Sequence, residues 1–253
     1  MERQNSNTTQ SFLQLANLFA QQGKYAEAEP LYQRVLSIYE KQSGVDHLDT
    51  ASVLNDLAEA YREQGKYAEA EPLCERVLSI YEKLLGVDHP LTAKGLNSLA
   101  FLYQCRRMYL EAELLHTRAL TIREQQLGVE HLDTAVSLNN LGIIYMEQGK
   151  YAQAEPLLQR ALSVREQQAG ADHPDTARSL NNLAELYRRK KMYAEAEPFY
   201  HRAISIYERR LGRSHPSMTM TLNNLALLYQ NQGDYARAEL VLRRALAIHG
   251  QDV

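Results

Sequence analysis

Apolar residues recur along this chain at spacings of three and four, the period that places side chains on one face of a helix. One predicted helix carries Leu54, Leu57, Ala58 and Tyr61 on such a face. A second runs from about Tyr67 to Leu85, and its apolar face consists of Ala70, Leu73, Cys74, Val77, Leu78, Tyr81 and Leu85. The Gln-Gly-Lys turn at residues 64–66 separates them, so this stretch is predicted to form a helix–turn–helix unit.

The same unit recurs through the whole chain. The tyrosine that opens its second helix returns every 42 residues, at Tyr25, Tyr67, Tyr109, Tyr151, Tyr193 and Tyr235. Six copies of 42 residues account for 252 of the 253 residues. A fixed period of this size indicates stacked repeats that bury a continuous core between neighbours. We therefore predict an all-α solenoid over residues 1–253 as a single array, with repeats at approximately 9–44, 50–86, 92–128, 134–170, 176–212 and 218–253.

Glycine and proline mark the ends of the predicted helices. Gly65 supplies the left-handed residue of the turn, Gly86 ends the second helix, and Pro90 suits the first position of the next one. Repeats 3 and 5 carry Arg107 and Lys191 in place of the turn glycine. We expect these two departures only to loosen the turn.

Histidine recurs in the loop that joins one repeat to the next, at His47, His89, His131, His173 and His215. Stacked helices would hold successive copies roughly 10 Å apart. Ligands of one metal ion lie about 2 Å from it. These histidines are therefore predicted to pack against or cap the loop, and we expect no metal site.

Composition narrows the classes of function. Hydrophobic residues make up 45% of the chain, and the net charge of −3 comes from interspersed acids and bases, which favours neither nucleic acid nor a membrane surface as partner. The chain has no apolar run of roughly 18 residues and no signal-peptide core. Cys74 and Cys105 read as unpaired thiols, which favours a cytoplasmic location. Phosphate-binding loops and nucleophile elbows are missing, so we expect neither an enzyme nor a cofactor.

The detailed pattern resembles the tetratricopeptide repeat (TPR): Leu-x-x-Leu-Ala-x-x-Tyr, then Gly-x-Tyr-x-x-Ala, then Ala-Leu. Repeat 5 carries it at Leu180, Leu183, Ala184, Tyr187, Tyr193, Ala196, Ala203 and Ile204. The 42-residue form, with Leu-Asn-Asn-Leu-Ala and Gly-x-Asp-His-Pro-Asp, resembles the cargo-binding repeats of kinesin light chains and related bacterial arrays. This resemblance implies a right-handed superhelical α-solenoid of six repeats. It also implies a non-catalytic scaffold whose concave groove, lined by the first helix of each repeat, holds a peptide.

Paired asparagines in the middle of the first helix are candidates for ligand contact. An asparagine there is unfavourable for the helix, yet repeats 4, 5 and 6 each keep two in a row. By the resemblance, the second of each pair faces the groove and binds the peptide backbone, which selects Asn140, Asn182 and Asn224. The alternative is that the asparagines tie adjacent helices together, and we expect this role for the first of each pair.

Basic residues on the same helices predict an acidic ligand. Arg178 lies four residues before Asn182, and Lys94 occupies the same position in repeat 3. Arg188 and Arg189 complete a cluster in repeat 5, since a guanidinium group binds carboxylates through two parallel hydrogen bonds. Solvated charge is the alternative for each of these residues. Ile143 and Met146 could offer apolar pockets on this face or belong to the core.

Three functions remain open from the sequence. The leading one is a protein- or peptide-binding scaffold. The second is a self-associating structural module, because the last helix presents Leu242, Ala245, Leu246 and Ile248 without a following repeat to cover them. The third is a regulatory or sensor fragment of a larger multidomain protein.

Overall fold

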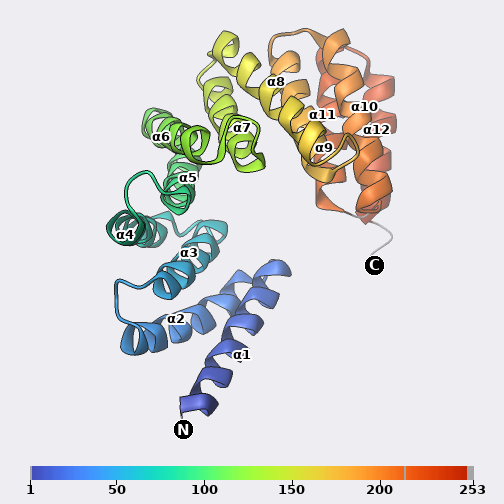
Figure 1. The fold of residues 1–253 in the computed structure, drawn as a ribbon. Helices are drawn as coiled ribbons and strands as arrows, with labels where there is room; N and C mark the ends of the chain where they lie inside the picture. The colour runs from blue at the N-terminus through green and yellow to red at the C-terminus, as the bar shows by residue number, and fades with distance from the viewer. Residues whose placement is uncertain (1, 214, 250–253) are drawn as a thin grey trace. The chain divides into compact units, whose positions relative to one another are not determined.

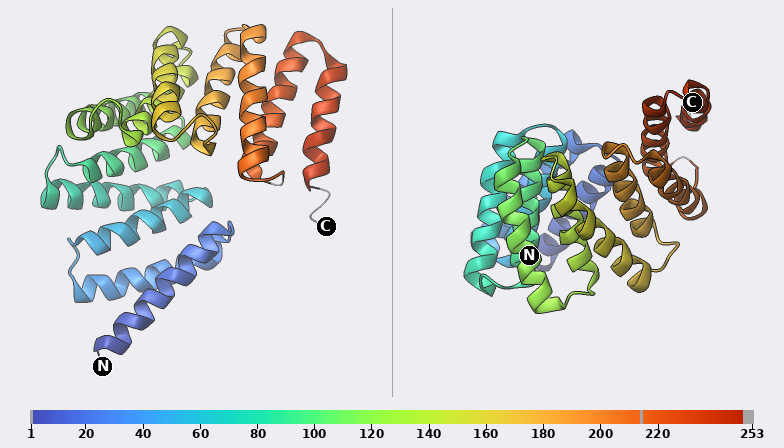
Figure 2. Two further views of the ribbon diagram at one scale, coloured as in Figure 1. Left: turned by 45° about the vertical axis from the view of Figure 1, so that its right-hand side comes forward. Right: turned by 90° about the horizontal axis from the view of Figure 1, so that it is seen from above.

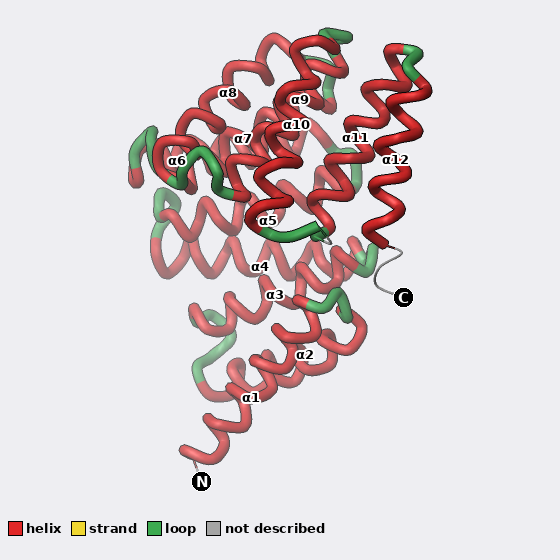
Figure 3. The backbone as a smooth tube through the Cα atoms, turned by 90° about the vertical axis from the view of Figure 1, so that its right-hand side faces the viewer, coloured by secondary structure: helices red, strands yellow, loops and turns green. Residues whose placement is uncertain are grey.

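The structure is a computed structural model that describes residues 2–213 and 215–249. Within these ranges the regular structure consists of helices joined by short loops (Figures 1 and 3). The helices are α1 Glu2–Gln21, α2 Tyr25–Gln42, α3 Leu48–Glu63, α4 Tyr67–Leu85, α5 Pro90–Cys105, α6 Tyr109–Leu127, α7 Leu132–Glu147, α8 Tyr151–Gln168, α9 Pro174–Arg189, α10 Tyr193–Arg210, α11 Pro216–Gln232 and α12 Tyr235–His249.

Consecutive helices pair as the repeat predicts, which makes the fold an all-α helical solenoid. In each repeat the odd-numbered helix is the A helix, and it packs against the even-numbered B helix that follows it. The chain divides into two compact units of three helix pairs, unit 1 at Met1–Gln126 and unit 2 at Leu127–Val253. Figure 2 shows the helix pairs of each unit in two further views. That all six repeats form one array stays a prediction.

Within each unit, A helices of successive repeats also lie side by side. Helix α3 contacts α5 in unit 1, and α9 contacts both α7 and α11 in unit 2. Equal or directly adjacent positions of successive repeats therefore meet across these contacts. This arrangement allows polar residues from two or three A helices to form one surface.

The small residue near the start of each B helix is buried, as expected for the closest approach of A and B helices. It is Ala28, Ala70, Ala112, Ala154, Ala196 or Ala238, in repeat order. Larger apolar residues of both helices are buried in the same core, for example Leu183 of α9 and Tyr200 of α10 in unit 2. Each buried leucine contributes about 1.5–3 kcal/mol, so this seam is a main source of stability.

The two turns without glycine keep the shape of the others. Arg107 and Lys191 have φ angles of 60° and 62°, close to the 74° of Gly65 and 75° of Gly149. Their hydrogen bonds are also kept, since Lys191 N donates to Arg188 O at 3.0 Å as Gly149 N donates to Met146 O at 3.1 Å. The expectation of a looser turn is therefore corrected: the departure appears as a side chain held in a left-handed conformation.

The loop histidines cap the A helices, as predicted. Each one is the N-cap residue, and its Nδ1 atom accepts a hydrogen bond from the backbone N–H two residues later, at 3.1 to 3.2 Å. A buried threonine completes the loop in four repeats, as Thr176 shows by donating from Oγ1 to the carbonyl of Gly170 at 2.8 Å. These bonds satisfy backbone groups that the ends of helices leave unpaired.

Part of the apolar face of the last helix, α12, is buried in the core of unit 2. Ala245 and Ile248 lie in the core of unit 2, so two of the four residues predicted to be uncovered are buried. Leu242 is half-buried, and Leu246 is 69% exposed. The apolar surface of α12 is therefore smaller than the sequence predicts.

Candidate functional site

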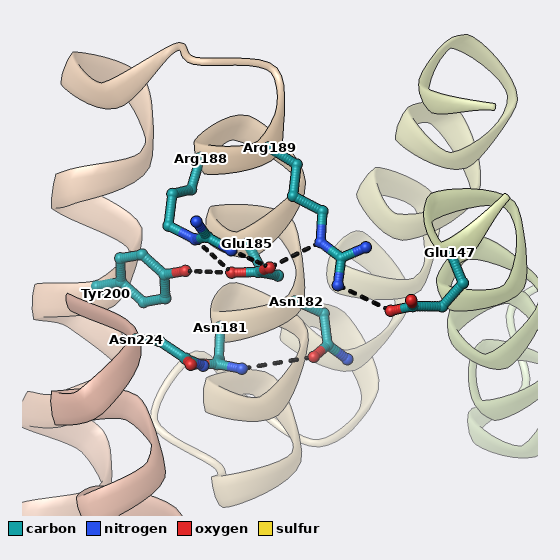
Figure 4. A network of polar contacts seen from close by, with 8 residues as sticks. All are labelled: Glu147, Asn181, Asn182, Glu185, Arg188, Arg189, Tyr200 and Asn224. Carbon is teal, nitrogen blue, oxygen red and sulfur yellow. Dashed lines mark hydrogen bonds and ion pairs between the residues drawn. The ribbon is translucent and has the colours of Figure 1, made fainter. Parts of the chain in front are cut away.

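A ladder of asparagine side chains joins the A helices of unit 2. Asn182 Nδ2 donates to Asn139 Oδ1 at 2.8 Å, and Asn224 Nδ2 donates to Asn181 Oδ1 at 3.1 Å. Asn139 and Asn181 are each 4% exposed, which confirms the tie expected for the first asparagine of a pair in repeats 4 and 5, whereas Asn223 of repeat 6 is exposed. Figure 4 shows the members of the ladder on α9 and α11.

The second asparagine of each pair takes part in the same ladder. Asn182 and Asn224 are half-buried, and each uses one side-chain N–H for the bond to the preceding A helix. Asn182 Oδ1 also accepts from Asn181 Nδ2 at 3.5 Å. An amide has two N–H donors and an oxygen with two lone pairs, so these bonds do not exhaust it. Asn140 lies half-buried at the same position of α7. Contact of these three residues with a ligand stays a prediction.

Unit 1 has a related tie with different side chains. Ser98 of α5 donates from Oγ to Oδ1 of Asn55 on α3 at 2.9 Å. Asn55 and Ser98 occupy the positions of Asn181 and Asn224. The register between neighbouring A helices is therefore fixed by a polar contact at the same place in both units.

Glu185 binds two of the three basic residues predicted to form a cluster in repeat 5, Arg188 and Arg189. Arg188 donates to its carboxylate at 2.6 and 2.8 Å, Arg189 donates at 2.7 Å, and the hydroxyl of Tyr200 donates at 3.1 Å (Figure 4). Arg189 also donates to Glu147 on α7 at 2.8 Å. Both guanidinium groups are thus already engaged with carboxylates inside the protein.

Burial and charge act in opposite directions on Glu185. Burial raises the pKa of its carboxyl group, while the hydrogen bonds from Arg188 and Arg189 lower it, and the net result is a lowered pKa. For Tyr200, burial and the neighbouring Glu185 carboxylate both raise the pKa of the hydroxyl. At neutral pH the cluster therefore holds an ionised carboxylate and a neutral tyrosine.

The remaining predicted residues separate into exposed and buried groups. Arg178 is 51% exposed and pairs with Asp175 at 2.5 Å. Lys94 is exposed on α5 and belongs to unit 1, whereas the other predicted residues belong to unit 2. Ile143 is half-buried against the core of unit 2, and Met146 is 4% exposed within it. Of the two alternatives that the sequence left open for Met146, an apolar pocket or the core, the structure shows the core.

A cavity of about 480 Å³ opens between α1, α2 and α3 in unit 1. Tyr32 of α2 is buried at its wall and donates its hydroxyl to Asn17 Oδ1 of α1 at 2.7 Å. Asp56 and Glu59 line the cavity from α3, and Ala20 lines it from α1. This cavity was not predicted from the sequence. Its signal is Asp56, which stands where repeats 4 to 6 have the second asparagine.

The carboxyl group of Asp56 has a strongly perturbed pKa. Burial and the neighbouring Glu59 carboxylate raise the pKa of Asp56 to about 6, against opposing effects of Lys94 and of a hydrogen bond with Asn55. The pKa of Tyr32 is raised to about 12 by burial and by the charges of Asp56 and Glu59. The residues that line the cavity thus include two carboxylates and no cation.

The described residues contain no group of three or more histidine, cysteine or acidic side chains that could hold a metal ion. Among the same residues, none of the helices combines the length and the apolar character that crossing a membrane requires.

Comparison with known structures places the fold among repeat proteins. The chain is 23% identical to BtubC (BKLC) from P. vanneervenii, with a TM-score of 0.69 over 90% of this chain and 89% of that one. It is 27% identical to a putative kinesin light chain of Podosopora anserina with nearly identical TPR-like repeats, with a TM-score of 0.66 over 81% and 98%. A Rap protein complexed with Competence and Sporulation Factor is 17% identical, with a TM-score of 0.66 over 95% and 74%.

Sequence comparison gives the family directly. No curated protein matches the chain. The model of the tetratricopeptide repeat matches it at residues 7–73, 49–125, 95–167, 133–209 and 175–251, which together span nearly all of its length. The chain therefore belongs to the tetratricopeptide repeat family, and its repeats are similar to those of the putative kinesin light chain.

Proposed function

We propose that this protein is a non-catalytic scaffold that binds a protein or peptide on the face of its A helices. The observation that carries the proposal is the alignment of polar side chains across α7, α9 and α11. Charged groups there meet at equal positions of successive repeats and amide groups at positions one residue apart, a spacing that suits a chain molecule lying across the helices. A protein of the same fold, the Rap protein, is known in complex with Competence and Sporulation Factor.

The ligand would contact the half-buried amides of Asn140, Asn182 and Asn224 through its backbone. An amide group offers both a donor and an acceptor, which matches any peptide irrespective of its side chains. Specificity then comes from the charged residues at the margin of this face. Arg188 and Arg189 are engaged with Glu185 and Glu147 in ion pairs that are mostly buried, whereas the ion pair of Arg178 with Asp175 is about half exposed, so attraction for an acidic ligand in unit 2 rests mainly on Arg178.

A selection from a displayed library of random 12-residue peptides tests the proposal. We expect binders that lose affinity when Asn182→Ala removes an amide, and acidic binders that lose it when Arg178→Glu reverses a charge. Arg209→Glu is a matched control, because Arg209 is an exposed arginine of a B helix that pairs with Asp172 at 2.9 Å. A selection without binders would count against the scaffold. Binders unaffected by both variants would show that this face is not the site.

Self-association through the C-terminal helix is a second proposal with a narrower basis. Leu240 and Leu246 of α12 remain about 70% exposed. If two copies meet there, the mass measured by light scattering should rise with protein concentration, and Leu246→Glu should abolish the rise. A mass that stays at the monomer value would exclude this interface.

A further inference from the structure

One position on the A helices decides whether the space beside the following B helix is filled. It is occupied by Ala20, Arg62, Gln104, Met146, Arg188 and Gln230 in repeats 1 to 6. The structure shows what happens to that space when the residue is an arginine and when it is an alanine. Because the repeats have the same fold, a repeat with arginine at this position can be compared directly with the repeat that has alanine.

In repeat 5 the arginine fills the space and neutralises a carboxylate. Arg188 donates to Glu185, and Tyr200 of the B helix donates to the same carboxylate at 3.1 Å. The side chains of Arg188 and Glu185 are each only 14% exposed. A guanidinium group is therefore accepted next to a buried tyrosine when a carboxylate is present.

Repeat 2 shows the same use of the position. Arg62 lies 3.5 Å from Glu59, binds Glu63 at 2.9 Å, and has its guanidinium group 4.5 Å from the centre of the Phe101 ring. The cavity that remains around it measures only about 20 Å³. Arginine again closes the space between the A helix and its neighbours.

Repeat 1 keeps the buried tyrosine but has neither the arginine nor the glutamate on its own A helix. Tyr32 stands at the position of Tyr200 and Asn17 at that of Glu185, and their hydroxyl–side-chain contact is kept at 2.7 Å. Ala20 replaces the arginine, and the open cavity measures about 480 Å³. Two carboxylates, Asp56 and Glu59, now line it from the next A helix.

We propose that this cavity between α1, α2 and α3 binds an arginine side chain of the ligand, in the place that Arg188 occupies in repeat 5. The inference rests on the proposed scaffold function and adds the chemistry of one anchor residue. The guanidinium group would lie between the carboxylates of Asp56 and Glu59, with its alkyl part along Ala20 and Tyr32. Fixed oxygen acceptors of this kind match the planar fork of guanidinium donors.

The charges around the cavity favour a cation over a neutral group. Asp56 and Glu59 contribute negative charge from α3, and the Tyr32 hydroxyl of α2 is neutral at pH 7. Two cations oppose them, Lys94 of α5 and Arg62 of α3, but Arg62 is engaged more closely with Glu63 than with Glu59. Lys94→Ala should therefore strengthen binding of a cationic probe.

The test uses two short peptides and the full chain. The probes are acetyl-Ala-Arg-Ala-amide and the same peptide with citrulline, which has the shape of arginine without its charge. Binding is followed at pH 7.5 by the NMR shifts of the Asp56 and Glu59 carboxyl carbons and of the Tyr32 ring. We expect saturable shifts with the arginine peptide and at least about tenfold weaker binding of the citrulline peptide, a difference of about 1.4 kcal/mol.

Variants distinguish binding of the arginine peptide in the cavity from a general attraction of the protein for cations. Asp56→Asn should weaken binding of the arginine peptide about tenfold, and Ala20→Arg should abolish it by supplying the guanidinium group from within. Asp49→Asn, which changes an exposed carboxylate of the same helix, should leave it unchanged. A thermal melt of Ala20→Arg at or above the wild-type midpoint shows that its loss of binding is not unfolding.

Two results would overturn the inference: equal affinity for both peptides, or undiminished binding by Ala20→Arg. The library selection through Arg178 and Asn182 is independent of this cavity. If the library gives binders but the arginine peptide does not bind in the cavity, the inference is overturned and the scaffold function stands. A bound arginine peptide without any library binders would remove the scaffold function and leave a cation pocket.

Discussion

Asn181 on α9 accepts a hydrogen bond from the side-chain amide of Asn224 on α11 at 3.1 Å while it is itself 4% exposed. The same bond joins Asn139 and Asn182 one repeat earlier. Because a buried polar group without a partner is costly, these bonds favour one register of neighbouring A helices over any other. The asparagines therefore disfavour their own helix locally and stabilise the contact between helices.

The ladder predicts a difference in stability between two neighbouring asparagines. Asn181→Ala removes a buried hydrogen bond, whereas Asn223→Ala changes an exposed residue at the same position of repeat 6. Both variants gain equally in helix propensity. We expect Asn181→Ala to be about 1–2 kcal/mol less stable than Asn223→Ala in urea unfolding. Equal midpoints for the two would mean that the ladder contributes nothing measurable.

The left-handed turn residues predict a stabilising substitution. Lys191 has a φ of 62°, where a side chain collides with its own backbone and glycine does not. Lys191→Gly should raise the free energy of unfolding by about 0.5–1 kcal/mol, and Gly149→Ala should lower it by a similar amount. Urea unfolding of both variants checks this. Destabilisation by Lys191→Gly would show that contacts of the lysine outweigh the strain.

The fold follows from the sequence because its determinants are periodic. The apolar face that begins at Leu54 and the caps at His47 and its counterparts depend on residues within one turn or one repeat. The cavity depends on Ala20, Tyr32 and Asp56 from three helices, and no spacing along the chain brings such residues together. An alignment of the six repeats shows that Ala20 stands at the position of Arg188. Only the folded protein shows how far the side chain of Arg188 reaches, and therefore how much space an alanine leaves there.

A second coupling between repeats escaped the sequence analysis for the same reason. Tyr81 packs against α5 at Gly95, where an added Cβ would lie 3.3 Å from its ring. Arg165 takes the position of Tyr81 in repeat 4, and its buried guanidinium group donates to the hydroxyl of Ser179 at 2.6 Å. The two changes compensate each other between a B helix and the next A helix. A single repeat does not show this pairing.

The raised pKa of Asp56 predicts that this residue opposes folding at neutral pH. Its carboxyl group binds a proton more tightly in the folded protein, with a pKa of about 6, than in the unfolded chain, where the reference value is 3.8. Stability is therefore lost as pH rises from about 4 to above 6. Asp56→Asn should be about 1–2 kcal/mol more stable than wild type at pH 8 and no more stable at pH 4.

Urea unfolding at both pH values measures the difference, and the pH 4 experiment serves as the control. A gain of equal size at pH 4 would assign the effect to packing and not to charge. The same variant is expected to bind the arginine peptide less well. Asp56 would then be a residue whose charge is kept for binding at a cost in stability.

His116 predicts a pH dependence of the opposite sign. Its ring is fully buried, Nδ1 lies 2.7 Å from Asn97 Oδ1, and Nε2 has no hydrogen-bond partner among the described residues. Burial and the positive charge of Arg123 lower the pKa of His116 to about 4, from 6.5 in the unfolded chain. Below pH 6.5 the unfolded chain takes up a proton that the folded protein does not. Stability is therefore present above pH 6.5 and is lost as pH falls towards 4.

His116→Gln tests this, because glutamine keeps a donor for Asn97 and does not titrate. At pH 8 we expect the variant to be less stable than wild type, because a shaped ring in a packed core is lost. Between pH 6.5 and 4.5 the gap should narrow by about 2 kcal/mol, since only the wild type loses stability through the histidine. Urea midpoints at half-unit steps of pH measure the gap. Parallel curves for the two proteins would mean that the ring is reached by water and protonates in the folded state.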